Sequence, residues 1–166
     1  MIEENPRRAK EILSVFSSDD NIVGAEVGVA FGCTSQYLFR HLPNLFLYQI
    51  DPYIDKEDMY DKFIKRMKGY HNRKFHKTTS QKAANQIPNN LNFVFIDAHH
   101  KYESVKNDIS IWWPKVAVGG WLFGHDYRYR DFPGVVRAFN EFLGTIPFPC
   151  RTGLDDGKTI RIQKLS

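Results

Sequence analysis

Residues 92–100 read Asn-Phe-Val-Phe-Ile-Asp-Ala-His-His, an apolar run that ends in an acid and two histidines. A short, uninterrupted apolar run is typical of a strand that is buried on both faces of a parallel sheet. Similar short runs alternate with longer amphipathic stretches along nearly the whole chain. This alternation predicts βα units, and therefore an α/β fold in which helices cover both faces of a mostly parallel sheet.

The order of these stretches predicts five βα steps and then a β-hairpin, which together give one sheet of seven strands. Strands are predicted at residues 22–29, 45–50, 74–78, 92–96 and 121–124, and helices at residues 6–16, 34–41, 56–70, 80–86, 104–113 and 135–143. The hairpin is predicted from residues 148–152 and 159–164, because Asp155-Asp156-Gly157 between them is a turn signal. Gly119-Gly120 is predicted to form a turn, and Thr34 or Ser35, and Ser80, are suited to cap helices.

The chain has 166 residues, which leaves room for a single domain, with one helix in residues 1–20 and the core in residues 21–166. With 42% hydrophobic and 25% charged residues, the composition excludes a disordered or low-complexity chain. No run of about 18 apolar residues occurs, and the first residues lack the apolar stretch of a signal peptide. We therefore expect a soluble, cytoplasmic protein without a membrane partner.

The net charge is +4, and the excess is concentrated in residues 62–77, which hold seven Lys or Arg residues and no acid. A solvated helix face followed by a loop is the commoner origin of such a stretch, and binding to an anionic partner is the alternative. A nucleic acid is therefore not the expected partner.

Polar and charged residues gather where the predicted strands end. In an open parallel sheet the ligand crevice lies at the carboxyl ends of the strands, so these positions are the first candidates for a functional site. They are Glu26 to Gly32, Asp51, Thr79 to Gln81, Asp97 to His100, and His125 to Tyr127. The sequence thus predicts a site that is rich in carboxylates and imidazoles.

The segment Glu26-Val27-Gly28-Val29-Ala30-Phe31-Gly32 is a glycine-containing turn between the first strand and its helix. Such a turn binds either a dinucleotide or a nucleoside cofactor, but the GxGxxG pattern is absent, because Ala30 stands at the second glycine position. Glu26 would repel a pyrophosphate, whereas it suits a ligand with ammonium and sulfonium charges. Asp51, 23 residues beyond Gly28, is placed to accept the ribose hydroxyls of either cofactor. A tight turn with a surface acid remains the alternative.

Several segments form a more specific combination than the glycine loop alone. They are Glu26 to Gly32, Asp51, the block Phe95-Ile-Asp97-Ala-His-His100-Lys-Tyr102-Glu, Asp108, Gly119-Gly120, and Gly124-His-Asp-Tyr127 followed by Gly134-Val135. Together they resemble the class I S-adenosylmethionine-dependent methyltransferases, and most of all methyltransferase family 24, which is similar to macrocin-type and catechol-type O-methyltransferases. The likeness covers about residues 23–142 and implies a three-layer, Rossmann-like methyltransferase fold with S-adenosylmethionine as cofactor.

The resemblance also implies which residues hold the cofactor. The residues assigned in this way are Glu26, Gly28, Asp51, Ser80, Gln81 and Asp97. Glu26 and Gly28 would lie along the methionine part, Asp51 would bind the ribose hydroxyls, and the pair at positions 80 and 81 would lie by the adenine.

The same resemblance raises the question of a metal. Asp97 and Asp126 match the acids that hold a divalent ion, Mg²⁺ or Mn²⁺, in the metal-dependent members. His99 and His125 depart from the macrocin-type pattern, which has acids at these positions. Both the metal and the identity of the base are therefore left open by the sequence.

Methyl transfer from a sulfonium is an in-line displacement, so the enzyme has to align the nucleophile with the methyl carbon and deprotonate it. An alcohol needs help at neutral pH, either from a histidine or from a metal ion that stabilises the alkoxide. His99, His100 and His125 are the candidate bases, and Asp97 with Asp126 would hold the metal. Asp97 and the three histidines are thus the candidate catalytic residues.

The leading hypothesis is O-methylation of a small hydroxylated molecule. Arg128 and Arg130 follow the last site segment and could clamp an anionic group on that acceptor. The short chain leaves little to cover the acceptor site, so a loop or a second copy of the chain in a homo-oligomer would have to close it.

Three alternatives remain open. A nicotinamide-dependent oxidoreductase would use the same sheet, but the absent GxGxxG pattern and Glu26 disfavour it. A cofactor-binding module without turnover is suggested by His99 and His125 in place of acids. Methylation of a nucleic acid would rest on residues 62–77, but no strand end carries the Asn/Asp-Pro-Pro-Tyr/Phe motif of amino-methylating enzymes.

Overall fold

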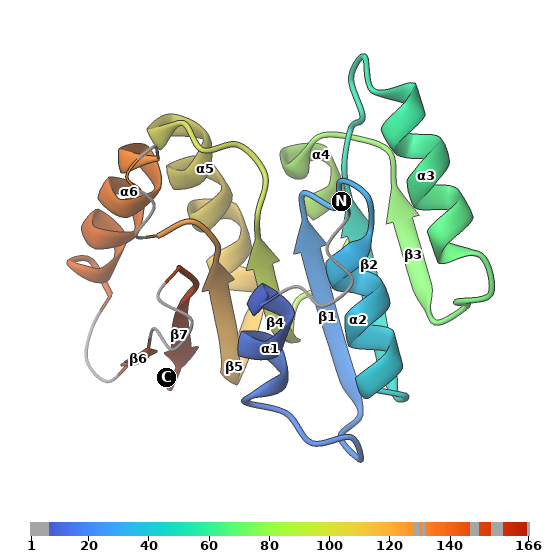
Figure 1. Ribbon diagram of the computed structural model, residues 1–166. Coiled ribbons are helices and arrows are strands. Elements are labelled where there is room, and N and C mark those ends of the chain that lie inside the picture. Colours follow the sequence, from blue (N-terminus) through green and yellow to red (C-terminus); the bar gives the residue numbers. More distant parts are fainter. Residues whose placement is uncertain (1–6, 128–129, 131, 147–149, 154–157, 166) are drawn as a thin grey trace.

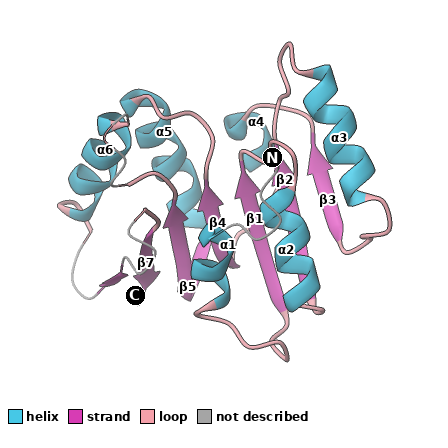
Figure 2. Ribbon diagram, viewed as in Figure 1, coloured by secondary structure: helices cyan, strands magenta, loops and turns pink. Residues whose placement is uncertain are grey.

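The computed structural model describes residues 7–127, 130, 132–146, 150–153 and 158–165 (Figure 1). The strands are β1 (Ile22–Val27), β2 (Leu45–Ile50), β3 (Arg73–His76), β4 (Leu91–Ile96), β5 (Val116–Gly124), β6 (Cys150–Gly153) and β7 (Ile160–Lys164). The helices are α1 (Arg7–Leu13), α2 (Cys33–His41), α3 (Glu57–Met67), α4 (Ser80–Ala84), α5 (Tyr102–Trp112) and α6 (Pro133–Leu143), with a short 3-10 turn at Trp113–Lys115. Figure 2 shows how strands and helices alternate as far as α6.

The strands form one sheet of seven in the order β3-β2-β1-β4-β5-β7-β6. β1 pairs in parallel with both β2 and β4, so the first strand lies in the interior of the sheet. β7 is antiparallel to both of its neighbours, β5 and β6, so that six strands share one direction. The strand order reverses between β1 and β4, and open α/β sheets bind ligands at such a switch point. The predicted α/β, Rossmann-like fold is confirmed.

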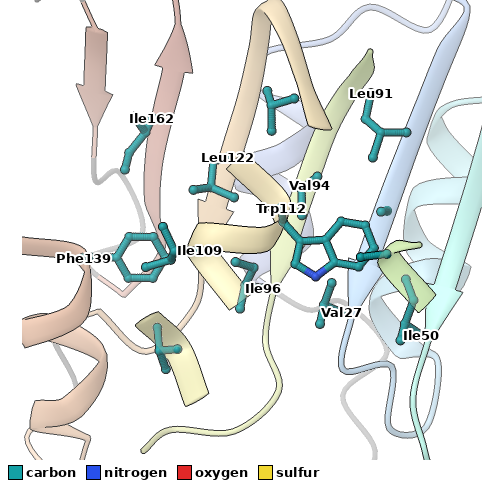
Figure 3. Close-up of a cluster of buried hydrophobic side chains, with 14 of the residues drawn as sticks. Val27, Ile50, Leu91, Val94, Ile96, Ile109, Trp112, Leu122, Phe139 and Ile162 are labelled. Carbon is teal, nitrogen blue, oxygen red and sulfur yellow. The ribbon is translucent and has the colours of Figure 1, made fainter. Parts of the chain in front are cut away.

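Helices cover both faces of the sheet, as the alternation predicts. α4, α5 and α6 pack on one face, and α1, α2 and α3 pack on the other (Figure 1). Figure 3 shows the core between the sheet and α4, α5 and α6, in which the fully buried ring of Trp112 lies among aliphatic side chains of the sheet. The indole N–H of Trp112 donates to Oγ of Ser80 at 2.8 Å, so its polar tip has a partner inside the fold.

The C-terminal hairpin is confirmed as β6 and β7, which pair antiparallel. Its predicted turn, Asp155-Asp156-Gly157, lies outside the described residues. No helix in the described part of the chain is long and apolar enough to cross a membrane.

β5 begins five residues before the predicted strand, so the prediction that Gly119-Gly120 forms a turn ahead of that strand is wrong. Both glycines lie within β5, where the register with β4 shifts between Leu91 and Phe93. A Cβ at Gly120 would lie 2.9 Å from the carbonyl oxygen of Asn92, so glycine lets the two strands stay close across this irregularity.

The predicted helix caps are also wrong. α2 begins after Gly32, whose φ of +73° is left-handed, and Thr34 and Ser35 are buried within its first turn. α4 begins at Ser80 itself, after Thr79, which makes no side-chain cap. The hydroxyls of Thr34, Ser35 and Ser80 instead make hydrogen bonds between elements.

Gly28 is the point at which the loop after β1 passes closest to the end of β4. Its φ is +91°, and its N–H donates to the carbonyl oxygen of Ile50 at 2.9 Å. A Cβ at this position would lie 2.2 Å from the carbonyl oxygen of Asp97, which is far inside van der Waals contact. Glycine is therefore required at position 28 both for its backbone conformation and for the close approach of two strands.

We expect Gly28→Ala to lower the free energy of unfolding by at least about 2 kcal/mol more than Gly69→Ala. The φ values of the two glycines are +91° and +93°, so the backbone strain of an alanine is common to both variants. No atom lies within 4 Å of a Cβ built at Gly69, so only Gly28→Ala adds an overlap. Urea unfolding followed by circular dichroism measures both losses, and equal losses would contradict the close approach at Gly28.

Candidate functional site

Asp51 joins the end of β2 to the glycine loop after β1. Its Oδ2 accepts hydrogen bonds from the backbone N–H groups of Val29 at 3.1 Å and Ala30 at 3.0 Å. Its Oδ1 accepts one from the N–H of Tyr53 at 2.9 Å. A carboxylate has about four acceptor positions, so the half-buried Asp51 keeps one for a ligand hydroxyl. Asp51 thus shapes the loop, including the left-handed Ala30, at the carboxyl end of β2.

Glu26, in β1, is buried and connected to three other elements. Oγ of Ser35 in α2 donates a hydrogen bond to Oε2 of Glu26. The same Oγ accepts a hydrogen bond from Nε2 of Gln49 in β2 at 2.6 Å, and Oε1 of Gln49 accepts one from Nη1 of Arg73 in β3 at 3.1 Å. These four side chains therefore form one directed chain of hydrogen bonds that ends at Glu26.

Burial raises the pKa of Glu26 to about 8, although the hydrogen bond from Ser35 and the charge of Arg8 oppose the rise. The negative charges of Asp97 and Asp51 add to it. The carboxyl group of Glu26 therefore holds its proton at neutral pH while no cation lies beside it. An ammonium group nearby would favour the ionised form.

The ends of β4 and β5 bring two carboxylates and a histidine together. One ligand atom from each of Asp97, His100 and Asp126 lies within 4.8 Å of the other two. Nε2 of His100 lies 2.8 Å from Oδ2 of Asp126, and the His100 ring stacks on Phe132 with the ring centroids 3.9 Å apart. The hydrogen bond and the stack together fix the orientation of the imidazole.

His125 lies between the same two carboxylates. Its Nδ1 is 3.1 Å from Oδ2 of Asp126 and 3.4 Å from Oδ1 of Asp97, but neither oxygen is aligned for a hydrogen bond, so the attraction is ionic. Burial alone would lower the pKa of His125, but the two carboxylates outweigh burial and raise the pKa to about 9. Burial would likewise raise the pKa of Asp126, yet His125 and His100 together hold it below its usual value. His125 is therefore a cation at neutral pH.

Other predicted site residues lie apart from this group. His99 is exposed and is not one of the three residues whose ligand atoms come together, although it lines the same small cavity as His100 and His125. Ser80 is partly buried, and its Oγ accepts the hydrogen bond from Trp112, whereas Gln81 is exposed. Asp108 is buried nearby, and burial raises its pKa even though Ser80 hydrogen-bonds to it.

Four polar residues near the site were not among the predicted site residues. They are Arg8, Thr34, Ser35 and Gln49. Gln49 carries a signal that could have been used, since it is a polar residue inside the otherwise apolar strand β2 and is fully buried. No sequence signal marks Arg8 as a residue near the site, because its position there depends on how α1 packs on the rest of the fold.

An open cavity of about 750 Å³ lies over the exposed face of α6. Its lining includes Tyr127, which directly follows Asp126, and the side chains of Arg130 and Arg137. Arg128, the other arginine predicted to clamp an anionic group, lies outside the described residues.

The basic stretch at residues 62–77 covers part of α3, β3 and the turn between them. Lys62 and Lys77 form ion pairs with acids of α3. Arg66 and Arg73 donate hydrogen bonds to glutamine side chains. Four of the seven cations are thus engaged within the chain.

The pKa of Glu26 predicts how stability depends on pH. Between the ordinary value of about 4.5 and about 8, the folded protein keeps a proton that the unfolded chain has released. The free energy of unfolding should therefore fall as the pH rises through this range, by at most about 1.4 kcal/mol per pH unit. Glu26→Gln, which cannot ionise, should remove this decline.

Chemical unfolding of wild type and Glu26→Gln at several pH values between 5 and 8.5 measures the difference. Because all other groups are common to both proteins, the difference in unfolding free energy isolates Glu26. Glu57→Gln, at an exposed acid of α3, serves as the matched control. A difference that is constant with pH would contradict a raised pKa.

Comparison with known proteins places these residues in a family. The sequence model of methyltransferase family 24, a methyltransferase domain, matches residues 25–127, which is more than half of the chain. A curated relative, the uncharacterized protein R132 of Acanthamoeba polyphaga mimivirus, is 36% identical over 61 residues. This match covers 36% of the present chain and only 28% of that protein's length.

Two solved structures share the fold at low identity. The O-methyltransferase from Bacillus cereus in complex with SAH (S-adenosylhomocysteine) has a TM-score of 0.70 and 14% identity, over 98% of this chain and 83% of that chain. An rRNA methylase from Streptococcus thermophilus has a TM-score of 0.72 and 15% identity, over 100% of this chain and 99% of that chain. These two likenesses establish the fold and not the substrate. Since the family match runs from the glycine loop to Asp126 and Tyr127, the chain belongs to methyltransferase family 24.

Proposed function

We propose that this protein transfers a methyl group from S-adenosylmethionine to a hydroxyl group of a small molecule. The observation that carries the proposal is the switch point between β1 and β4, where Glu26, Asp51 and Asp97 lie at the strand ends around a loop whose Gly28 has no room for a side chain. Membership of a methyltransferase family supports it. S-adenosylmethionine supplies an electrophilic methyl group attached to a sulfonium.

The residues at the strand ends suit the parts of this cofactor. Glu26 and Asp97, on neighbouring strands, would face the ammonium group, and the remaining acceptor position of Asp51 would bind a ribose hydroxyl. The hydroxyl of Ser80 already accepts a hydrogen bond from the indole of α5, so the exposed Gln81 has the freer side chain to meet the adenine.

His100 is the best-placed base for the acceptor hydroxyl. When its Nε2–H donates to Asp126, its Nδ1 carries the lone pair that accepts a proton, and within the described residues no hydrogen bond reaches Nδ1. A carboxylate that fixes the tautomer of a histidine in this way is a common catalytic arrangement. His125, with a pKa of about 9, is already protonated at neutral pH and would instead stabilise negative charge.

A divalent metal is the alternative way to activate the acceptor. Asp97, His100 and Asp126 offer two carboxylates and one imidazole within 4.8 Å, a set that fits Mn²⁺, Fe²⁺ or Zn²⁺ better than the oxygen-preferring Mg²⁺. The charge of a metal there would stabilise the alkoxide. Protonated His125 would compete with it for the same two acids.

The acceptor is proposed to carry an anionic group. Arg130 and Arg137 line the open cavity over α6, which also reaches Tyr127, the residue after Asp126. Nε of Arg137 donates a hydrogen bond to Glu141 at 2.9 Å. A guanidinium pairs well with a carboxylate or phosphate. The cavity volume of about 750 Å³ fits a small molecule.

Isothermal titration calorimetry with S-adenosylmethionine and S-adenosylhomocysteine tests the cofactor. We expect both to bind, and Asp51→Ala to lose about 1.5–3 kcal/mol of affinity, because the charged carboxylate no longer accepts a hydrogen bond from a ribose hydroxyl. Asp61→Ala, an exposed acid of α3, should leave the affinity unchanged. Binding of neither ligand would overturn the proposal, and binding of NADH in their place would favour the oxidoreductase alternative.

Methyl transfer to a panel of small hydroxylated carboxylic acids tests the base. His100→Ala should lower the rate about 10²- to 10⁴-fold, and EDTA should have no effect. The matched control is His71→Ala, since His71 is exposed and precedes β3. If EDTA abolishes activity and Mn²⁺ restores it, the metal alternative holds. Cofactor binding without turnover on any acceptor would favour a binding module.

A further inference from the structure

We propose that Arg8 binds the carboxylate at the amino-acid end of the cofactor, so that α1 contributes directly to the cofactor site. The proposal rests on the use of S-adenosylmethionine argued above. It adds a residue that lies outside the family match, which begins at residue 25.

The side chain of Arg8 reaches from α1 to the strand ends at the switch point. Its Nε donates a hydrogen bond to Oγ1 of Thr34, in the first turn of α2, at 3.0 Å. The same Nε lies 3.5 Å from Oδ2 of Asp97, at the end of β4. Its charge is near enough to Glu26 to lower the pKa of that carboxyl group. With 29% of its side chain exposed, Arg8 is accessible from solvent.

The hydrogen bond to Thr34 and the 3.5 Å approach to Asp97 both involve Nε. Among residues 7–127, 130, 132–146, 150–153 and 158–165, no hydrogen bond reaches the two terminal nitrogens of Arg8. Those two nitrogens form the planar fork that pairs with both oxygens of a carboxylate. Thr34 and Asp97 therefore anchor the group while its pairing edge stays available.

The acids at the strand ends make a cation necessary if a carboxylate is to bind there. The amino-acid end of the cofactor carries an ammonium and a carboxylate on the same carbon, so a site for it needs both signs within a few ångströms. Asp51 and Asp97, together with Glu26 once the ammonium group favours its ionised form, would by themselves repel the carboxylate. Arg8 supplies the opposite charge, and Thr34 lies in the first turn of α2, where the helix dipole is positive.

A purely structural role for Arg8, as a tie between α1 and the core, would involve the same contacts. The two roles differ in which part of the ligand depends on Arg8. 5′-Methylthioadenosine has the adenine, the ribose and a thioether sulfur of S-adenosylhomocysteine but lacks the amino-acid end. A comparison of the two ligands therefore isolates the carboxylate.

Calorimetry on Arg8→Met tests the proposal. The expected result is S-adenosylhomocysteine binding that is about 10- to 100-fold weaker, with the affinity for 5′-methylthioadenosine unchanged. Arg7→Met changes the neighbouring exposed arginine of the same helix and should alter neither affinity. Arg8→Lys should give an intermediate loss for S-adenosylhomocysteine alone, because an ammonium is a point charge without the fork.

Equal weakening of both ligands by Arg8→Met, or weakening of neither, would overturn the role of Arg8. If thermal melting shows that Arg8→Met does not fold, Arg8→Lys decides. A loss confined to S-adenosylhomocysteine then supports the proposal, and any other pattern overturns it. A wild-type protein that binds neither ligand would refute the proposed cofactor itself, whereas one that binds both keeps the cofactor and tests Arg8 alone.

Discussion

Negative charge is concentrated at the strand ends of this sheet, and the surrounding elements are arranged to compensate it. The acids concerned are Glu26, Asp51, Asp97 and Asp126. Glu26 keeps its proton, Asp51 accepts three backbone N–H groups, and the other two share a guanidinium and two imidazoles. Removing one partner of a buried ion pair costs about 3–5 kcal/mol, because the other charge is left unpaired. A change at one acid therefore alters the protonation of the groups paired with it. The positions of α1, of α2 and of the loop after β5 are therefore tied to this balance.

The parts of the site that belong to the parallel strands are open to prediction from sequence. Uninterrupted apolar runs predict β2 and β4, and parallel strands end at one edge of a sheet, so the acids after them are expected to converge. Asp97 and Asp126 are predicted together on these grounds, and the structure brings both to His100. Ala30 stands where the GxGxxG pattern has its second glycine, which lets the loop approach a pyrophosphate. In this loop the N–H of Ala30 donates to Asp51 instead.

Contacts between elements that lie far apart in the sequence cannot be predicted from local sequence patterns. Thr34 and Ser35 have the composition of helix caps, but tertiary partners take their hydroxyls. Arg8 precedes the glycine loop by some twenty residues, and only the docking of α1 on α2 brings it to Asp97. Gly119-Gly120 has the composition of a turn, yet pairing with β4 holds it within a strand. In each case packing between elements outweighs the local preference.

β3 lies at one edge of the sheet and carries two cations of the basic stretch within its four residues. An exposed strand edge presents unpaired backbone groups, and another molecule can add a strand there. Short length and lysine side chains are the usual protection against such association, and Lys74 of β3 is exposed. The positive charge of this region therefore opposes edge-to-edge pairing between sheets of separate molecules. Replacing it with apolar, β-branched residues would turn this edge into a site of aggregation.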